Sequence, residues 1–274
     1  MTHCFLSFIA LLISFQGWGQ ELFVSTEAAS NIPSRSVNIK MTGHFSPKNR
    51  IYDRGAQRYN GKIQLGVSRK LMLQFGGTLS NMYTAGVQSE SYFGYAKYRF
   101  LSVDELHRHF RMAAFVSGSK SNAPFHYNES NLFGEKSGFE AGVISTQLWN
   151  RFALSGTFSH LQVLDASRFN DAVYIPKRSF SFINYSLASG YLVLPKQYSS
   201  YKQVNVNIYV EVLGQQALNQ SKYFIDLAPA VQAIFFSNMK LNIGYRIQVS
   251  GNMERMTRNS WTIGVERSFL NVIK

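Results

Sequence analysis

Nine charged side chains fall on the polar face of segments in which apolar and polar residues alternate. A charge on such a face can pair with an opposite charge, fill a polar interior or steer ions through it. The sequence therefore predicts an interior whose chemistry is electrostatic, and these nine residues are its expected lining. They are Lys40, Lys62, Lys97, Arg99, Arg111, Glu211, Asp226, Arg246 and Glu266.

Two interpretations of this charged lining are open at this point. If Lys40, Arg246 and Glu266 lie at similar heights on neighbouring strands, they form a paired network that holds the wall together. If instead the lysines and arginines of the lining are unpaired, they line a path for anions. The cations of this path would be Lys40, Lys62, Lys97 and Arg246. Long side chains can fill an interior of this size as well as line a channel through it.

The histidines and serines do not form a recognisable catalytic or metal-binding set. His107 and His109 lie in a predicted turn near Asp104 and Glu105, but a metal site needs more ligands that converge on one point. Hydrolysis would need a nucleophile, a base and an orienting group within mutual reach, and no spacing marks a serine as activated near His126. No phosphate-binding glycine loop or nucleic-acid module is present. We therefore predict no catalytic residue, no metal site and no cofactor.

The alternation also predicts which elements position these side chains. Residues 37–45 place apolar side chains on one face and Lys40 and His44 on the other, and residues 261–269 repeat the pattern. The inner faces of a soluble sandwich must be dry, whereas a transmembrane barrel has lipid outside and a polar lumen inside. The sequence predicts an all-β fold, a transmembrane antiparallel up-and-down β-barrel of about 12 strands.

Twelve alternating segments have the length that a tilted strand needs to cross a membrane. Short turns such as 68–70 and 150–151 alternate with longer polar links, which is typical of outer-membrane barrels, so the short turns and both termini are expected at the periplasmic end. The pattern leaves the register open around 101–108, 138–149 and 194–202. The expected segments are 36–46, 59–68, 71–80, 90–100, 109–120, 138–149, 152–162, 179–193, 203–213, 222–235, 240–250 and 260–270.

The composition is typical of an exported membrane barrel. Only 16% of the residues are charged, against about 25% in soluble domains. The net charge of +13 favours attraction to anionic lipid headgroups or lipopolysaccharide, or selection of anionic solutes. Nucleic acid is not expected as a partner, because the chain is exported and has no basic run.

The chain is expected to have three parts. Residues 1–19 combine a short apolar run with a small-residue cleavage pattern and predict a signal peptide. Cys4, the only cysteine, lies within it, so the mature chain would have no disulfide. Residues 20–35 are expected to be irregular, either tucked into the lumen or lying in the periplasm. Residues 36–274 are expected to form the outer-membrane β-barrel.

Five segments spread over nearly the whole chain carry a resemblance to a known family. They are STEAASNIPSRS (25–36), YAKYRFL (95–101), HRHFRMAAF (107–115), YFIDLAPAVQ (223–232) and LNIGYRIQVSGNM (241–253). In these segments the chain resembles a family of uncharacterised outer-membrane β-barrel proteins of Bacteroidota. The resemblance implies a barrel in the outer membrane of a Gram-negative envelope, and it implies no particular activity or site.

These features support two functional hypotheses for a protein of the cell outer membrane. The first is a small-solute channel or porin-like transporter with an anion bias. The second is a closed structural barrel that acts as an anchor or subunit of an envelope or secretion complex, with contacts through the outer loops 121–137 and 163–178. The expected partners are outer-membrane lipids, small anionic solutes and other envelope proteins. A barrel enzyme is the third and weakest class.

Overall fold

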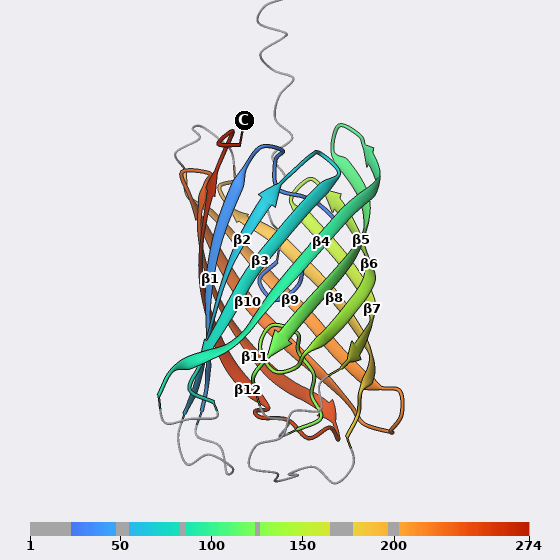
Figure 1. Cartoon of the computed structure of the whole chain (residues 1–274). Coiled ribbons are helices and arrows are strands. Elements are labelled where there is room, and N and C mark those ends of the chain that lie inside the picture. Colours follow the sequence, from blue (N-terminus) through green and yellow to red (C-terminus); the bar gives the residue numbers. More distant parts are fainter. Residues whose placement is uncertain are drawn as a thin grey trace, which may run out of the picture.

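Twelve antiparallel strands close into one barrel in the computed structural model (Figure 1), which describes residues 23–47, 55–82, 86–123, 127–164, 178–196 and 203–273. Each strand pairs with its neighbours in sequence, and the first strand closes the barrel against the last. The prediction of an up-and-down β-barrel is confirmed. The strands are β1 Val37–Ser46, β2 Ala56–Gly66, β3 Leu71–Ser80, β4 Gln88–Asp104, β5 Arg108–Ser121, β6 Gly138–Trp149, β7 Phe152–Val163, β8 Ser181–Leu194, β9 Asn205–Ala217, β10 Tyr223–Phe235, β11 Met239–Gly251 and β12 Asn259–Phe269.

The side chains alternate between the two faces of the barrel wall as the sequence predicts. In β12, Ile263 and Val265 point outward and are exposed, whereas Thr262 and Glu266 point inward and are buried. Apolar side chains of the other strands continue this outer band, for example Val143 on β6. A closed barrel leaves no strand edge unpaired, and an apolar band around it fits hydrocarbon. The barrel is therefore built to cross a membrane.

No helix among the described residues has the length and hydropathy to cross a membrane.

The connections differ in length at the two ends of the barrel. Turns 67–70, 105–107, 150–151 and 236–238 are short and lie at the end where β1 begins and β12 ends, which is the upper end in Figure 1. Most of the links at the opposite end are longer, apart from the short β9–β10 link 218–222, and the longer β8–β9 link 195–204 lies at the same end as the short turns. In outer-membrane barrels the short turns lie at the periplasmic end and the longer links at the extracellular end. We therefore call the end of this barrel with the short turns the periplasmic end and the other the extracellular end.

The three segments with an open register differ in outcome. At 101–108, β4 extends to Asp104 and β5 begins at Arg108, so the two strands continue as a hairpin, with a register shift between Arg99 and Leu101. β6 pairs without a register shift on both sides. β8 ends at Leu194 after a shift, and residues 197–202 lie outside the described part, as do the expected signal peptide and most of the loop at 163–178.

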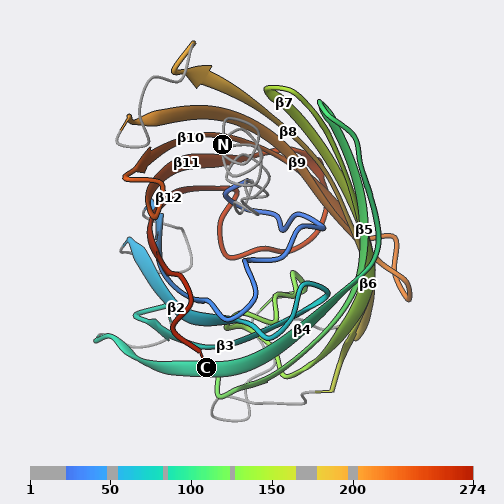
Figure 2. The same cartoon turned by 90° about the horizontal axis from the view of Figure 1, so that it is seen from above.

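The interior of the barrel contains the described part of the N-terminal segment. Figure 2 shows this segment, in blue, winding across the inside of the barrel ahead of β1. Residues 23–36, which we call the plug, include the buried Phe23, Ala28, Ala29 and Ile32. Of the two places considered for this segment, the lumen is the one observed for these residues. The plug therefore decides what the charged interior side chains contact.

Candidate functional site

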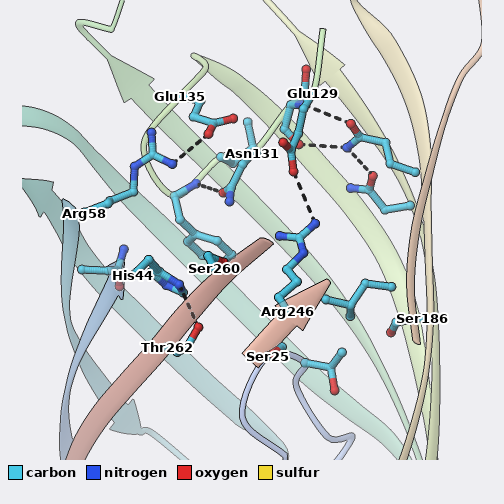
Figure 3. Close-up of a pocket in the computed structure, with 18 of the residues that line it drawn as sticks. Ser25, His44, Arg58, Glu129, Asn131, Glu135, Ser186, Arg246, Ser260 and Thr262 are labelled. Carbon is cyan, nitrogen blue, oxygen red and sulfur yellow. Dashed lines mark hydrogen bonds and ion pairs between the residues drawn. The ribbon is translucent and has the colours of Figure 1, made fainter. Parts of the chain in front are cut away.

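A cavity of about 370 Å³ lies inside the barrel, between the plug and the loops at the extracellular end. Residues of the plug form its floor, inward-facing side chains of the strands form its wall, and residues of the β5–β6 and β11–β12 loops form its roof. We call these two loops the mouth loops. In Figure 3, His44 and Thr262 lie on one side of the cavity, Ser186 lies on the other, and Glu129 lies above Ser25.

Glu211 on β9 holds the first residues of the plug. Its Oε1 accepts hydrogen bonds from the backbone amides of Val24 and Ser25, both at 2.9 Å, and its Oε2 accepts one from the amide of Thr26 at 2.7 Å. The Glu211 side chain is buried, so these three amides replace water as partners of the carboxylate. A carboxylate expected in the lumen is thus an anchor for the plug.

Glu27 anchors the plug to the wall formed by β2 and β4. The Nζ atom of Lys62 lies 2.8 Å from Glu27 Oε1, and the Nζ atom of Lys97 lies 3.6 Å from Glu27 Oε2. Lys97 also donates hydrogen bonds to the backbone carbonyls of Ala28 at 2.7 Å and Ser30 at 2.9 Å. Two of the expected lumen lysines therefore hold the plug.

An aromatic contact adds packing to these polar anchors. The rings of Phe23 in the plug and Tyr209 on β9 meet edge to face, with centroids 5.5 Å apart. Tyr209 pairs in register with Gly190 on β8. A Cβ atom at Gly190 would lie 2.5 Å from the Tyr209 ring, so only glycine lets this ring lie against the wall. Burial of the Phe23 ring removes apolar surface from water, and this stabilises the docked plug in addition to the polar anchors.

A row of charges runs across four neighbouring strands on the inner wall. Lys40 on β1 lies opposite Glu266 on β12 and opposite Lys62 on β2. Glu266 lies opposite Lys240 on β11, whose Nζ atom is 2.7 Å from Glu266 Oε1. The expected network of Lys40, Glu266 and Arg246 is therefore wrong for Arg246, because the residue of β11 that lies opposite Glu266 is Lys240.

Arg246 instead belongs to a cluster beneath the mouth loops, together with Arg255, Asp226 and Glu129. Arg246 forms an ion pair with Asp226 on β10 and lies 3.3 Å from Glu129 Oε1. Arg255 contacts Glu129 at 2.9 Å and Asp226 at 2.6 Å, and its guanidinium lies 3.9 Å from the centroid of the Phe224 ring. This cluster ties both mouth loops to the wall.

The charges of this cluster set the pKa of Glu129. Burial alone would raise the pKa of this carboxyl, but the attraction of Arg255 and Arg246 and the hydrogen bonds from Arg255 outweigh it and hold the pKa below its ordinary value. Burial would likewise lower the pKa of the Arg255 guanidinium, and Glu129 and Asp226 raise it instead. Glu129 and Arg255 are therefore both charged at neutral pH.

A second ion-pair cluster fixes the β5–β6 loop on the opposite side. Arg58 on β2 contacts Glu90 on β4 at 2.7 Å and Glu135 of the loop at 2.8 Å. Next to it, His44 Nδ1 lies 3.1 Å from Thr262 Oγ1. Figure 3 shows the Arg58–Glu135 pair above the His44–Thr262 pair.

The remaining two of the nine expected residues lie toward the periplasmic end. Arg111 donates a hydrogen bond to Ser30 Oγ of the plug at 2.9 Å and pairs with Asp104 at 3.0 Å. Arg99 donates to the carbonyl of Arg69 at 2.8 Å, in an exposed turn. Arg111 thus joins the residues that hold the plug, whereas Arg99 contacts the rim of the barrel.

Several interior residues were missed by sequence reasoning. Lys240 lies on the same face of β11 as Arg246, and Arg58 lies on the same face of β2 as Lys62. The alternation was therefore sufficient to find both residues. Glu27, Glu90, Glu129, Glu135 and Arg255 had no such signal, because they lie in the plug, in the mouth loops or beside the register shift of β4.

The described histidines form polar contacts without a metal cluster. His109 Nδ1 lies 2.8 Å from Asp104 Oδ1, and His160 Nε2 lies 2.8 Å from Ser181 Oγ, both at exposed positions. Within the described ranges, no group of three or more His, Cys, Asp or Glu side chains is placed to hold a metal ion. His126 lies outside these ranges.

The comparisons with known proteins concern the fold. No protein-family model and no curated protein matches the chain. A solved structure described as "KdgM porin" has a TM-score of 0.52 at 8% identity and covers 85% of this chain and 99% of its own. The COG4313 outer membrane channel from Pseudomonas putida F1 has a TM-score of 0.52 at 12% identity and covers 90% of this chain and 100% of its own. The chain shares the barrel fold of these proteins.

Proposed function

We propose that this protein is an outer-membrane channel for small polar solutes with a preference for anions, and that the plug narrows its lumen. The cavity inside the barrel carries this proposal. Among the described residues, six cationic side chains and four carboxylates line it, so its wall has a net positive charge that attracts anions. They are Lys40, Arg58, Lys62, Arg246, Arg255 and Arg258 against Glu27, Glu129, Glu135 and Glu140.

The cellular location and the family are part of the same proposal. The apolar outer band supports the outer membrane as the location, since only closed barrels and helices satisfy their backbone groups in lipid. The two proteins named above are described as a porin and an outer membrane channel, which supports transport as the role in preference to catalysis. The resemblance in segments such as 95–101 and 241–253 supports membership of the Bacteroidota family.

Outer-membrane lipids are the partners we propose for the periplasmic rim. Exposed cations surround the short turns at this end, among them Arg69, Lys70, Arg108 and Lys196. Tyr191 lies on the outer face near them, and the Arg151 guanidinium is 5.7 Å from the centroid of its ring. Cations beside a girdle of aromatic side chains suit anionic headgroups at the membrane surface.

The experiment that tests the channel is the reversal potential across a planar bilayer under a salt gradient. Arg258 is an exposed residue that lines the mouth of the cavity. Arg258→Glu should therefore shift permeability toward cations by up to roughly fivefold, because a charge in water contributes about 1 kcal/mol or less and about 1.4 kcal/mol corresponds to a factor of ten. Lys120→Glu is the matched control, since Lys120 is exposed on the outer face near the same end. An unchanged reversal potential in Arg258→Glu would contradict the proposed path.

A closed structural barrel is the second candidate, and the anchors of the plug favour it. The plug is held like a fixed element, through its contacts with Glu211, Lys62, Lys97 and Arg111. A closed barrel of this kind would serve an envelope complex through its loops. The two functions differ in one result. A folded barrel that lacks residues 23–32 conducts ions if it is a plugged channel, and it does not if the mouth loops also seal it.

A further inference from the structure

Three side chains of the inner wall converge on one carboxylate of the plug. The Nζ atom of Lys62 lies 2.8 Å from Glu27 Oε1, and the Nζ atom of Lys97 lies 3.6 Å from Glu27 Oε2. Gln74 Nε2 donates a hydrogen bond to Glu27 Oε1 at 3.3 Å. One ammonium group therefore lies at each oxygen of the carboxylate. We call Lys62, Gln74 and Lys97 the lysine site.

The lysine site belongs to the barrel wall and not to the plug. Its residues lie on the neighbouring strands β2, β3 and β4, and these strands pair with one another without help from residues 23–36. The site therefore persists when the plug leaves, whereas Glu27 leaves with the plug. Lys97 would then also lose the carbonyls of Ala28 and Ser30, to which it donates hydrogen bonds.

Release of the plug would remove the carboxylate that neutralises the two lysines. With the plug docked, the side chain of Lys97 is fully buried and that of Lys62 is 11% exposed. Charges that lose their partner in a confined lumen attract another group of opposite charge to replace it. An anion that enters the lysine site supplies this charge, so its binding stabilises the released state of the plug.

Glu27 fills the lysine site imperfectly because it is tethered to the plug. Its Oε1 atom has the close contacts, whereas its Oε2 atom accepts no hydrogen bond from any residue that the structure describes. A carboxylate that is not tethered can move closer to Lys97 and accept a hydrogen bond at each oxygen. We propose that the lysine site binds the carboxylate group of a solute, that Glu27 occupies it as an internal ligand, and that solute and plug compete for it.

This inference rests on the proposed function and deepens it, because it names the solute class and links solute entry to release of the plug. Glu27 and Lys62 both line the cavity, so a solute in the cavity reaches the lysine site from the cavity floor. A ligand that binds only the released state raises the population of that state in proportion to its own concentration, once this exceeds the dissociation constant. Carboxylates would therefore open the path that the plug narrows.

Chemical rescue tests the site itself. Glu27→Ala deletes a CH₂–COO⁻ group, which acetate matches in size and charge, and calorimetry of the full-length barrel in detergent measures acetate binding. Glu27→Ala should bind acetate, and the further change Lys62→Met should weaken this binding roughly ten- to a hundredfold, the range for one hydrogen bond to a charged group. Glu140→Ala is the matched control and should not bind acetate, because the Glu140 carboxylate accepts hydrogen bonds from the neutral Asn184 and Ser159.

Competition is measured with the lysine site and Glu27 unaltered. Ala28 is 1% exposed, so Ala28→Cys in a Cys4→Ser background reports release of the plug next to Glu27 through its rate of labelling with a maleimide. Acetate replaces chloride at constant ionic strength. At an acetate concentration of about ten times the dissociation constant of Glu27→Ala, the labelling rate should rise roughly tenfold. The neutral acetamide should leave the rate unchanged.

Each outcome of these experiments decides the inference. Acetate binding to Glu27→Ala that weakens with Lys62→Met, together with faster labelling in acetate, supports it. Absence of acetate binding to a folded Glu27→Ala barrel, equal binding with and without Lys62→Met, binding to Glu140→Ala, or labelling that acetate leaves unchanged overturns it. If Glu27→Ala does not fold, the labelling of the Ala28→Cys barrel decides alone.

Neither readout requires conductance. A barrel that binds acetate at the lysine site but does not conduct would refute the channel and leave the site in place. A barrel that conducts but does not bind acetate would keep the channel and refute the site.

Discussion

The anchor at Glu211 leads to the most detailed prediction. Three successive backbone amides of the plug donate to this one carboxylate, at 2.9, 2.9 and 2.7 Å. In Glu211→Gln the side chain keeps its shape and one acceptor oxygen, but it loses its charge. Its NH₂ group would face the amide of Thr26, which is also a donor. The change therefore weakens the plug contact without leaving a void.

The magnitude follows from these contacts. A hydrogen bond to a charged group contributes about 1.5–3 kcal/mol. Loss of one such bond and weakening of the other two should cost about 2–4 kcal/mol of docking free energy. Because 1.4 kcal/mol corresponds to a factor of ten, the undocked fraction of this part of the plug should rise roughly 30- to 700-fold.

Thiol labelling measures this fraction. Val24 is 8% exposed, and Cys4 is the only cysteine of the chain, so Val24→Cys in a Cys4→Ser background gives one reporter at a buried plug position. Local opening that is fast relative to labelling makes the labelling rate proportional to the undocked population. The rate with a maleimide should rise in Glu211→Gln by about the same factor as the population.

A matched variant separates this effect from general loosening of the barrel. Glu140 accepts a hydrogen bond from Asn184 at 2.9 Å and also one from Ser159, and neither residue belongs to the plug. Glu140→Gln should leave the labelling of residue 24 unchanged. Equal labelling rates in wild type and Glu211→Gln would refute the assignment of Glu211 as the plug anchor.

Three further predictions concern the mouth, the plug and the outer wall. The pKa of Glu129 is lowered in the docked loop, so the ionised carboxylate stabilises the docked loop. This stabilisation is complete above the ordinary pKa of 4.5 and is lost as the pH falls through the lowered pKa. Conductance should therefore rise below about pH 4.5, and Glu129→Gln should show the raised conductance at pH 7; a flat pH profile would contradict this. Phe23→Ala should cost about 3 kcal/mol of plug docking and speed the labelling of residue 24, and unchanged labelling would remove the ring contact with Tyr209 from the account. Val143→Arg should lower the free energy of unfolding in lipid by about 2–4 kcal/mol; an unaffected value would mean that Val143 does not face hydrocarbon.

The alternation of side chains was sufficient to predict the strands and which residues point inward. A period of two assigns a face to every residue of a strand, so Lys40, Glu211 and Glu266 could be placed on the inner wall without coordinates. It assigns no height, because height depends on the register between strands. This is why Arg246 was expected beside Glu266, where the structure has Lys240.

The partners of the interior charges could not be predicted for a different reason. Glu27 and Glu129 come from the plug and a mouth loop, which have no periodic pattern to fix their position. Whether Lys62 faces solvent or a carboxylate depends on where Glu27 lies in three dimensions. The preference of the cavity for anions therefore depends on residues that the strand pattern does not describe.

The measurement that tests the account most directly is single-channel conductance in planar bilayers, for the full-length protein and for a variant that lacks residues 23–32. The account predicts a small anion-selective conductance for the full-length protein and a larger one, with the same preference, for the variant. A correctly folded variant without any conductance would contradict the channel and leave the closed structural barrel as the function.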